Sequence, residues 1–236
     1  VWVRRFNLSG RPLGAAVEVE AGVERARSPA LAINERGRVM VSWESCCDTE
    51  GSTGVRARIF GPNLGALTAA FAVNETVAGV QRRPAVAANG NGFLVAWQGQ
   101  TGSIYEGRIF ARAFAPNGTP RGTEQQVSSG EGFGTAQIAP ALARSGAGYV
   151  AAWVDYDINF PVGIYAVATD ALGTPLSAEL KANQSPLGAQ RSVALAGNGL
   201  DSFALAYEAF EDDELGVSMQ RLVAQGNAPQ GALLVR

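Results

Sequence analysis

The sequence predicts an all-β fold of the β-propeller type, and two observations support this prediction. The first is a repeat, because a closing aromatic residue recurs at intervals of 54, 56 and 54 residues, at Trp43, Trp97, Trp153 and Tyr207. The second is composition: 29 glycines, 11 prolines and only 17% charged residues suit many short strands joined by tight turns. The period lies slightly above the ~40–50 residues of a propeller blade.

Each repeat contains four short apolar segments, here called strands A to D. Strands A and B fill the stretches Pro29–Trp43, Pro84–Trp97 and Pro140–Trp153 and the more decayed Val193–Tyr207. Strand A ends at an Asn/Gly turn such as Asn89-Gly90, which suits the positive φ angles of a tight hairpin turn. Strand B is continuously apolar in Phe93–Trp97, as in a strand that is covered on both faces. Strand C alternates in Ile109–Phe114, and no window has the apolar stripe of a helix, so we expect almost no helix.

The repeats divide the chain into one domain of about four and a half units. We assign a half repeat to 1–27 and full repeats to 28–82, 83–138, 139–191 and 192–236. Strands C and D then occur five times and strands A and B four times, about eighteen strands in all. Either the chain begins within a blade of a longer propeller, or the extra pair packs outside a four- or five-bladed ring. An open β-solenoid is the alternative architecture.

Two residue types recur in register and are expected to be structural. The aromatic that closes strand B is expected to pack as a wedge between adjacent blades. A glutamine stands three residues before strand A, and a polar residue in this place is expected to satisfy backbone groups between blades. These glutamines are Gln81, Gln137 and Gln190.

The consensus Q-x-x-P-A-V-A, followed by N-G-x-G-F-x-V-A-W and I-x-A-R-x-F, resembles repeats in large secreted or surface-attached bacterial proteins of the adhesin and haemolysin-like kind. The resemblance covers nearly the whole chain. It implies a β-propeller-like repeat, an extracytoplasmic location (secreted, cell surface or periplasmic) and a scaffold or binding role. It brings no catalytic residues.

The chemistry available to the chain is narrow. It has no histidine, which excludes Ser–His–Asp and Cys–His catalysis and histidine-ligated metals. A net charge of −2 argues against a nucleic-acid partner, and no apolar run is long enough to span a membrane.

We therefore expect no enzyme, but a non-catalytic module for adhesion or protein binding. One rim of loops would hold a protein or a neighbouring subunit. A lectin-like propeller that binds glycans is the alternative, and a carboxylate-pair glycoside hydrolase is a remote one. Its carboxylates would come from the loops after strand B: Asp155, Asp157, Glu211, Asp212 and Asp213.

One of these loops has the spacing of a calcium site. Asp155, Asp157 and Asn159 alternate as oxygen ligands do in calcium loops. The EF-hand pattern then fails, because Phe160 stands where glycine belongs and Ala166 where a bidentate glutamate is needed. We expect no cofactor other than a weakly held calcium ion.

The only cysteines, Cys46 and Cys47, are adjacent in the loop that follows Trp43. Their Cα atoms lie about 3.8 Å apart across a trans peptide, below the usual disulfide range of ~4.4–6.8 Å. A strained vicinal disulfide, two free thiols and an intermolecular link all remain open.

Overall fold

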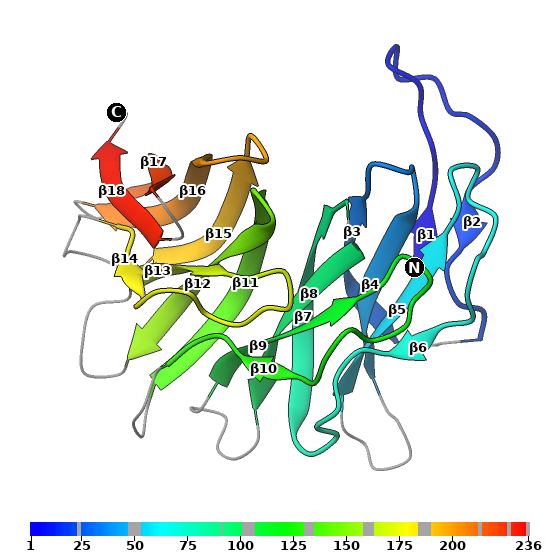
Figure 1. Cartoon of the computed structure of the whole chain (residues 1–236), viewed down its shortest axis with the longest axis horizontal. Coiled ribbons are helices and arrows are strands. Elements are labelled where there is room, and N and C mark those ends of the chain that lie inside the picture. Colours follow the sequence, from blue (N-terminus) through cyan, green and yellow to red (C-terminus); the bar gives the residue numbers. More distant parts are fainter. Residues whose placement is uncertain are drawn as a thin grey trace.

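The described chain is all-β. The computed structural model describes residues 1–234 apart from 23–24, 47–52, 91, 101–106, 130–134, 158–162, 184–189, 212–213 and 226–227. These residues form eighteen strands and no helix, so none of them lies in a helix that could span a membrane. Figure 1 shows the strands as a fan of small sheets, with β1 and β2 at one side and the C-terminal sheet at the other.

The strands form four blades, each with strands A, B, C and D in chain order and antiparallel. Single parallel pairings between strand C of one blade and strand A of the next join blades 1 to 3 into one twelve-stranded sheet. Strands β1 (Trp2–Val3) and β2 (Val17–Glu18) pair with each other as a separate unit. Blade 1 comprises β3 (Ala26–Ile33), β4 (Val39–Cys46), β5 (Thr53–Phe60) and β6 (Phe71–Ala72). Blade 2 comprises β7 (Val80–Asn89), β8 (Gly92–Gln100), β9 (Gly107–Phe114) and β10 (Gln125–Gln126).

The second half of the chain repeats this pattern. Blade 3 comprises β11 (Thr135–Ser145), β12 (Gly148–Asp157), β13 (Gly163–Thr169) and β14 (Leu180–Lys181). Blade 4 comprises β15 (Gln190–Gly197), β16 (Ser202–Glu211), β17 (Glu214–Gln225) and β18 (Ala228–Leu234). The A strands are innermost: β3 contacts β7, β7 contacts β11 and β11 contacts β15, whereas β3 and β15 share no comparable contact.

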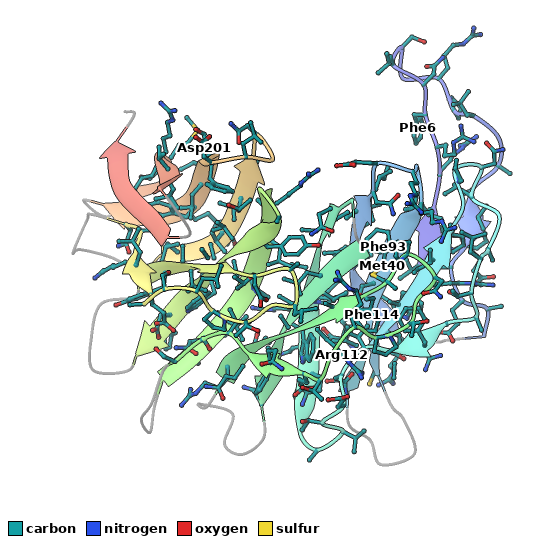
Figure 2. All side chains as sticks on the ribbon, viewed as in Figure 1. Phe6, Met40, Phe93, Arg112, Phe114 and Asp201 are labelled. Carbon is teal, nitrogen blue, oxygen red and sulfur yellow. The ribbon has the colours of Figure 1, made fainter. Side chains whose placement is uncertain are left out.

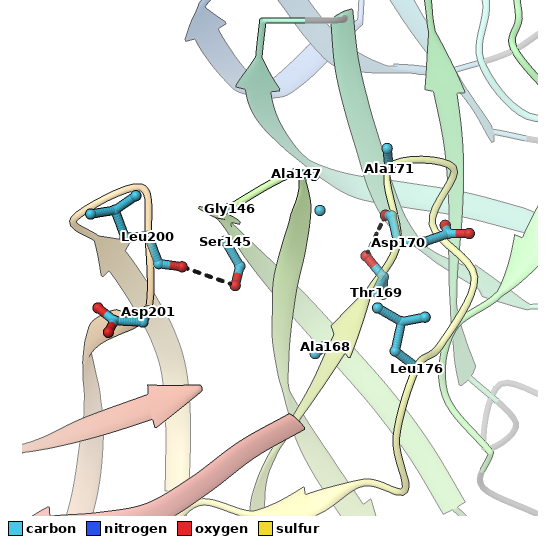
Figure 3. A pocket seen from close by; sticks show the side chains of 11 residues that line it. Ser145, Gly146, Ala147, Ala168, Thr169, Asp170, Ala171, Leu176, Leu200 and Asp201 are labelled. Carbon is cyan, nitrogen blue, oxygen red and sulfur yellow. Dashed lines mark hydrogen bonds between the residues drawn. The ribbon is translucent and has the colours of Figure 1, made fainter. Parts of the chain in front are cut away.

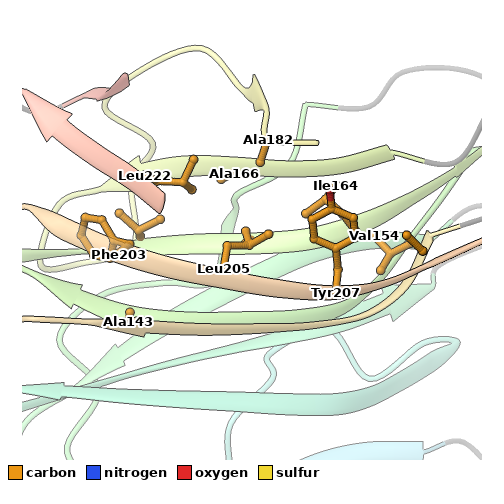
Figure 4. Close-up of a cluster of buried hydrophobic side chains, with 12 residues drawn as sticks. Ala143, Val154, Ile164, Ala166, Ala182, Phe203, Leu205, Tyr207 and Leu222 are labelled. Carbon is orange, nitrogen blue, oxygen red and sulfur yellow. The ribbon is translucent and has the colours of Figure 1, made fainter. Parts of the chain in front are cut away.

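The apolar cores lie between blades rather than within them. Since a strand's side chains alternate, each sheet presents one apolar face to the preceding blade and one to the following blade. Between blades 1 and 2, Met40 and Ile59 of one sheet pack with Phe93 and Trp97 of the other, and all four are buried. Figure 4 shows the equivalent cluster between blades 3 and 4, where Tyr207 and Phe203 face Val154 and Ile164.

The recurring aromatics lie in these inter-blade cores. Trp43, Trp97 and Trp153 are fully buried and Tyr207 is 3% exposed. The Trp97 indole N–H donates to the Gln81 side-chain oxygen at 3.0 Å, and the Gln81 amide donates to the carbonyl of Ala78. This glutamine therefore binds its own blade's tryptophan and the segment that enters the blade.

A β-bulge recurs in strand A of every blade. In blade 1, Arg27 lies opposite Glu44 and Ala30 opposite Ser42, so two residues of β3 face Trp43. The bulge carries a non-glycine residue in the left-handed region, which is uncommon. The four residues are Ser28, Arg83, Ala139 and Ser192, with φ between 50 and 53°.

The turn prediction at Asn89-Gly90 is wrong in its detail. Neither residue has a positive φ; the left-handed glycines of the other A–B turns are Gly37, Gly146 and Gly199. In blade 2 the close approach comes at Gly92, where a Cβ would lie 2.1 Å from the Phe114 carbonyl oxygen. The backbones of strands B and C leave no room for a side chain there.

Candidate functional site

The blades have two ends that differ in chemistry. At one end strand A begins and strand B leads into the B–C loop; we call this the B–C end. The other, the A–B end, holds the A–B and C–D turns. Most of the B–C loops lie outside the described residues, so the site is built from the strand ends beneath them.

A charged cluster lies at the B–C end of blades 1 and 2. Glu44 follows Trp43 in β4, is 6% exposed, and forms an ion pair of 3.7 Å with Arg27 of the innermost strand β3. From blade 2, Arg82 donates to the Gln100 side-chain oxygen at 3.4 Å. Burial lowers the pKa of Arg82, the charge of Arg83 lowers it further, and the Glu44 carboxylate acts in the opposite direction. Glu44 is thus a buried carboxylate with arginines from two adjacent blades around it.

Two buried glutamines continue this polar layer toward blade 3. Gln98 follows Trp97, and Gln137 lies near the start of β11 in blade 3; both are fully buried. Among the described residues, no partner is found for the side-chain amide of either one. A Cβ on Gly107 would lie 2.9 Å from the Gln137 carbonyl oxygen and 3.4 Å from the Gln98 amide nitrogen, so the two glutamines flank the same backbone.

A second acidic residue at this end is Asp155 of β12. It is half-buried and pairs in register with Gln137 of β11 and Gly163 of β13. Burial raises the pKa of Tyr165 on the neighbouring strand, and the carboxylates of Asp155 and Glu179 add to the rise. Asp155 lies near the end of strand B as Glu44 does, but one residue further along, because the blade-3 equivalent of Glu44 is Val154.

The other predicted site residues fall largely outside the described residues. Asp157 and Glu211 are the last residues of β12 and β16, and their side chains are not described. Asn159, Asp212 and Asp213 lie outside, so the calcium site stays a prediction. Cys46 ends β4 and is not a free thiol, but Cys47 lies outside, so the vicinal disulfide stays a prediction too. Gln190 begins β15, without a described side chain.

A pocket of about 310 Å³ lies at the opposite, A–B end, between blades 3 and 4 (Figure 3). Its two carboxylates serve the local turns. Asp170 accepts hydrogen bonds from the backbone N–H groups of Leu172 and Thr174, and Asp201 accepts from Asn198 and Ser202. The bonds to Asp170 are of the Asx type and hold the C–D turn, and those to Asp201 come from side chains of its own A–B turn.

The B–C end is therefore the better candidate. It offers Glu44, Asp155, the arginines of two innermost strands and buried amides, which together could bind a hydroxyl-rich ligand and supply carboxylates. Glu44 was missed in the sequence. Its signal was its position directly after Trp43, equivalent to Gln98, where the side chain must face the next blade.

No family model matches the sequence, and no curated protein matches it either. The fold, however, matches solved structures. An α-L-arabinanase from Penicillium chrysogenum, in complex with arabinobiose, has a TM-score of 0.62 at 12% identity over 90% of this chain and 68% of its own. An α-L-arabinofuranosidase from Lactobacillus brevis has a TM-score of 0.56 at 11% identity, over 86% and 70%. An endo-arabinanase from Bacillus licheniformis has 0.52 at 10%, over 89% and 79%.

These matches confirm the β-propeller fold, and they overturn two predictions. The expectation of a non-catalytic adhesion or protein-binding module is wrong, and so is the expectation that the chain is no enzyme, because the propellers it resembles are carbohydrate-active enzymes. The physical error lay in the weight given to the missing histidine. Glycoside hydrolysis needs two carboxyl groups and no imidazole. The comparisons support the propeller-like repeat, but they do not support the resemblance to adhesins and haemolysin-like proteins. The chain has the propeller architecture found in arabinan-degrading enzymes.

Proposed function

We propose that this chain is a glycoside hydrolase that acts on a polymeric glycan at the B–C end of its blades, with arabinose-containing chains as the substrate class. One observation carries the proposal: Glu44 is a buried carboxylate paired with Arg27, with the charge of Arg82 acting on it from the next blade, at an end of a propeller that matches arabinan-degrading enzymes. A carboxylate is rarely buried unless it is paired, and the partner of Glu44 is Arg27 of the innermost strand.

The chemistry follows from the residues available. Hydrolysis needs one carboxyl group to protonate the leaving oxygen and a second to activate water or to attack the sugar. Glu44 and Asp155 are the proposed pair, since both lie near the end of strand B, in blades 1 and 3. Arg27 and Arg82 would orient sugar hydroxyls through N–H donors, because a guanidinium presents several donors in a fixed plane. An extracytoplasmic location belongs to the same proposal, since polymeric glycans are met outside the cytoplasm.

The first test is a substrate panel. Purified protein is incubated with linear arabinan, arabinobiose and, as a control polymer, a cello-oligosaccharide, and new reducing ends are measured. We expect release from arabinan and none from the cello-oligosaccharide. Binding of arabinan without any release would favour the lectin-like alternative and contradict hydrolysis.

A further inference from the structure

The N-terminal strands β1 and β2 are the outer half of a blade. Arg4 lies over the ring of Phe6 at 5.9 Å, and its Nε donates to the Gly14 carbonyl. The C and D strands of blades 1 and 2 make the same two contacts. In blade 1 Arg58 lies over Phe60 and donates to Thr68, and in blade 2 Arg112 lies over Phe114 and donates to Gly122.

This half-blade also sits where a preceding blade would sit. Arg112 of blade 2 donates to the Val73 carbonyl of blade 1 at 3.2 Å. Arg58 of blade 1 donates in the same way to the Val19 carbonyl beside β2 at 2.7 Å. The half-blade therefore relates to blade 1 as blade 1 relates to blade 2, but it has strands of type C and D alone.

One edge of β1 lacks the partner that strand C has elsewhere. In blade 1, β5 pairs with β6 on one edge and with β4 on the other; among the described residues β1 pairs with β2 alone. The carbonyls of Val1 and Arg5 accept bonds from the β2 side. Since directions alternate along a strand, the amides of Trp2 and Arg4 point to the other edge.

The side chain that strand B would cover is exposed. Phe6 is 57% exposed, whereas its equivalents Phe60 and Phe114 are fully buried. Figure 2 shows Phe6 apart from the packed Met40, Phe93 and Phe114.

Two sheet faces that would each pack against a neighbouring blade are also exposed, one on blade 1 and one on blade 4. Leu31 and Ile33 of β3 are 53% and 61% exposed, whereas Val86, the equivalent of Leu31 in blade 2, is 9% exposed and packs against blade 1. At the other end of the fan, Val217 and Met219 of β17 are 79% and 47% exposed. Their equivalents in the other blades are all buried against the following blade: Val55 and Ala57, Ile109 and Ala111, and Ile164 and Ala166.

We propose that an antiparallel β-hairpin with the chemistry of strands A and B binds between blade 4 and blade 1. Its apolar strand B adds to the free edge of β1 and covers Phe6, as β4 covers Phe60. Its small-residue strand A covers Leu31 and Ile33, and its closing aromatic packs on Val217 and Met219. Strand addition of this kind uses backbone hydrogen bonds for affinity and alternate side chains for specificity.

The test supplies such a hairpin. A second copy of residues 80–100 is fused after Arg236 through a Gly/Ser linker, because an isolated hairpin is only marginally stable and a linker raises its effective concentration. In the control fusion the copied tryptophan, leucine and valine of strand B are replaced by serine. We expect amide exchange at Trp2 and Arg4 to slow at least tenfold and the melting temperature to rise in the native fusion alone.

Equal exchange in the two fusions would overturn the proposal, as would protection of these amides in the parent chain by self-association. A second variant tests the proposal in the parent chain, without any fusion. Phe6→Asp should leave the melting temperature of the parent chain unchanged, and a large loss there would show that Phe6 is already covered. No enzymatic readout is involved, so the result is independent of the proposed function.

Discussion

At the scale of single residues, the recurring tryptophans are among the largest side chains that are fully buried between blades. Trp97 is fully buried and its indole N–H is bound by Gln81. Trp97→Ala should cost ~3–5 kcal/mol, because it leaves a cavity between blades 1 and 2 and a buried amide oxygen without its donor. Urea unfolding measures this change. Trp2→Ala is the matched control, since Trp2 is 65% exposed, and a similar loss in both variants would contradict the wedge role.

The calcium prediction also belongs to single residues. If Asp155, Asp157 and Asn159 bind calcium, the affinity should be weak, near ~10⁻⁴–10⁻³ M, because the loop lacks a bidentate glutamate. The melting temperature should then rise with millimolar calcium, since the ion binds the folded form alone. Asp157→Ala should abolish the rise. If the melting temperature of the wild type does not change with calcium, the calcium prediction is wrong and the segment is an ordinary polar loop.

At the scale of elements, the strand-A bulge is the feature that the sequence hid. The apolar runs and their turns are local patterns, so strands A to D and their order could be predicted. The left-handed residue of the bulge is serine, arginine, alanine and serine in the four blades, and none of these types signals a positive φ. In every blade the bulge lies opposite the closing aromatic of strand B, so its place is defined by pairing between strands and not by a local sequence pattern.

Strain in the bulge can be measured. Ala139 has φ 53°, where an L-residue loses about 1–2 kcal/mol relative to glycine, partly offset by the greater freedom of glycine in the unfolded chain. Ala139→Gly should therefore stabilise the protein by roughly 0.5–1 kcal/mol. Ala141→Gly, two residues further along regular β11, should destabilise it by roughly the same amount. Thermal unfolding of both variants gives the comparison, and a loss in each would show that the bulge is unstrained.

At the scale of the whole molecule, the repeat period predicted the blades, but it did not predict how the ring of blades closes. The count of eighteen strands was correct for the described residues, and the half repeat at the N-terminus forms a half-blade beside blade 1. Function was harder to predict, because the site depends on residues from separate blades. Glu44 and Arg82 are 38 positions apart, and only the stacking of blades brings their charges together.

The central claim is that carboxylates at the B–C end cleave a glycan, and variants at the two ends of the propeller test it most directly. Release of reducing ends from linear arabinan is compared for the wild type, Glu44→Gln and Glu35→Gln. Glu35 is the control, because it lies at the A–B end in an exposed ion pair with Arg144. Loss of a catalytic carboxyl group should lower the rate about 10²–10⁴-fold in Glu44→Gln, while Glu35→Gln keeps the wild-type rate. A folded Glu44→Gln variant with wild-type activity would contradict the account.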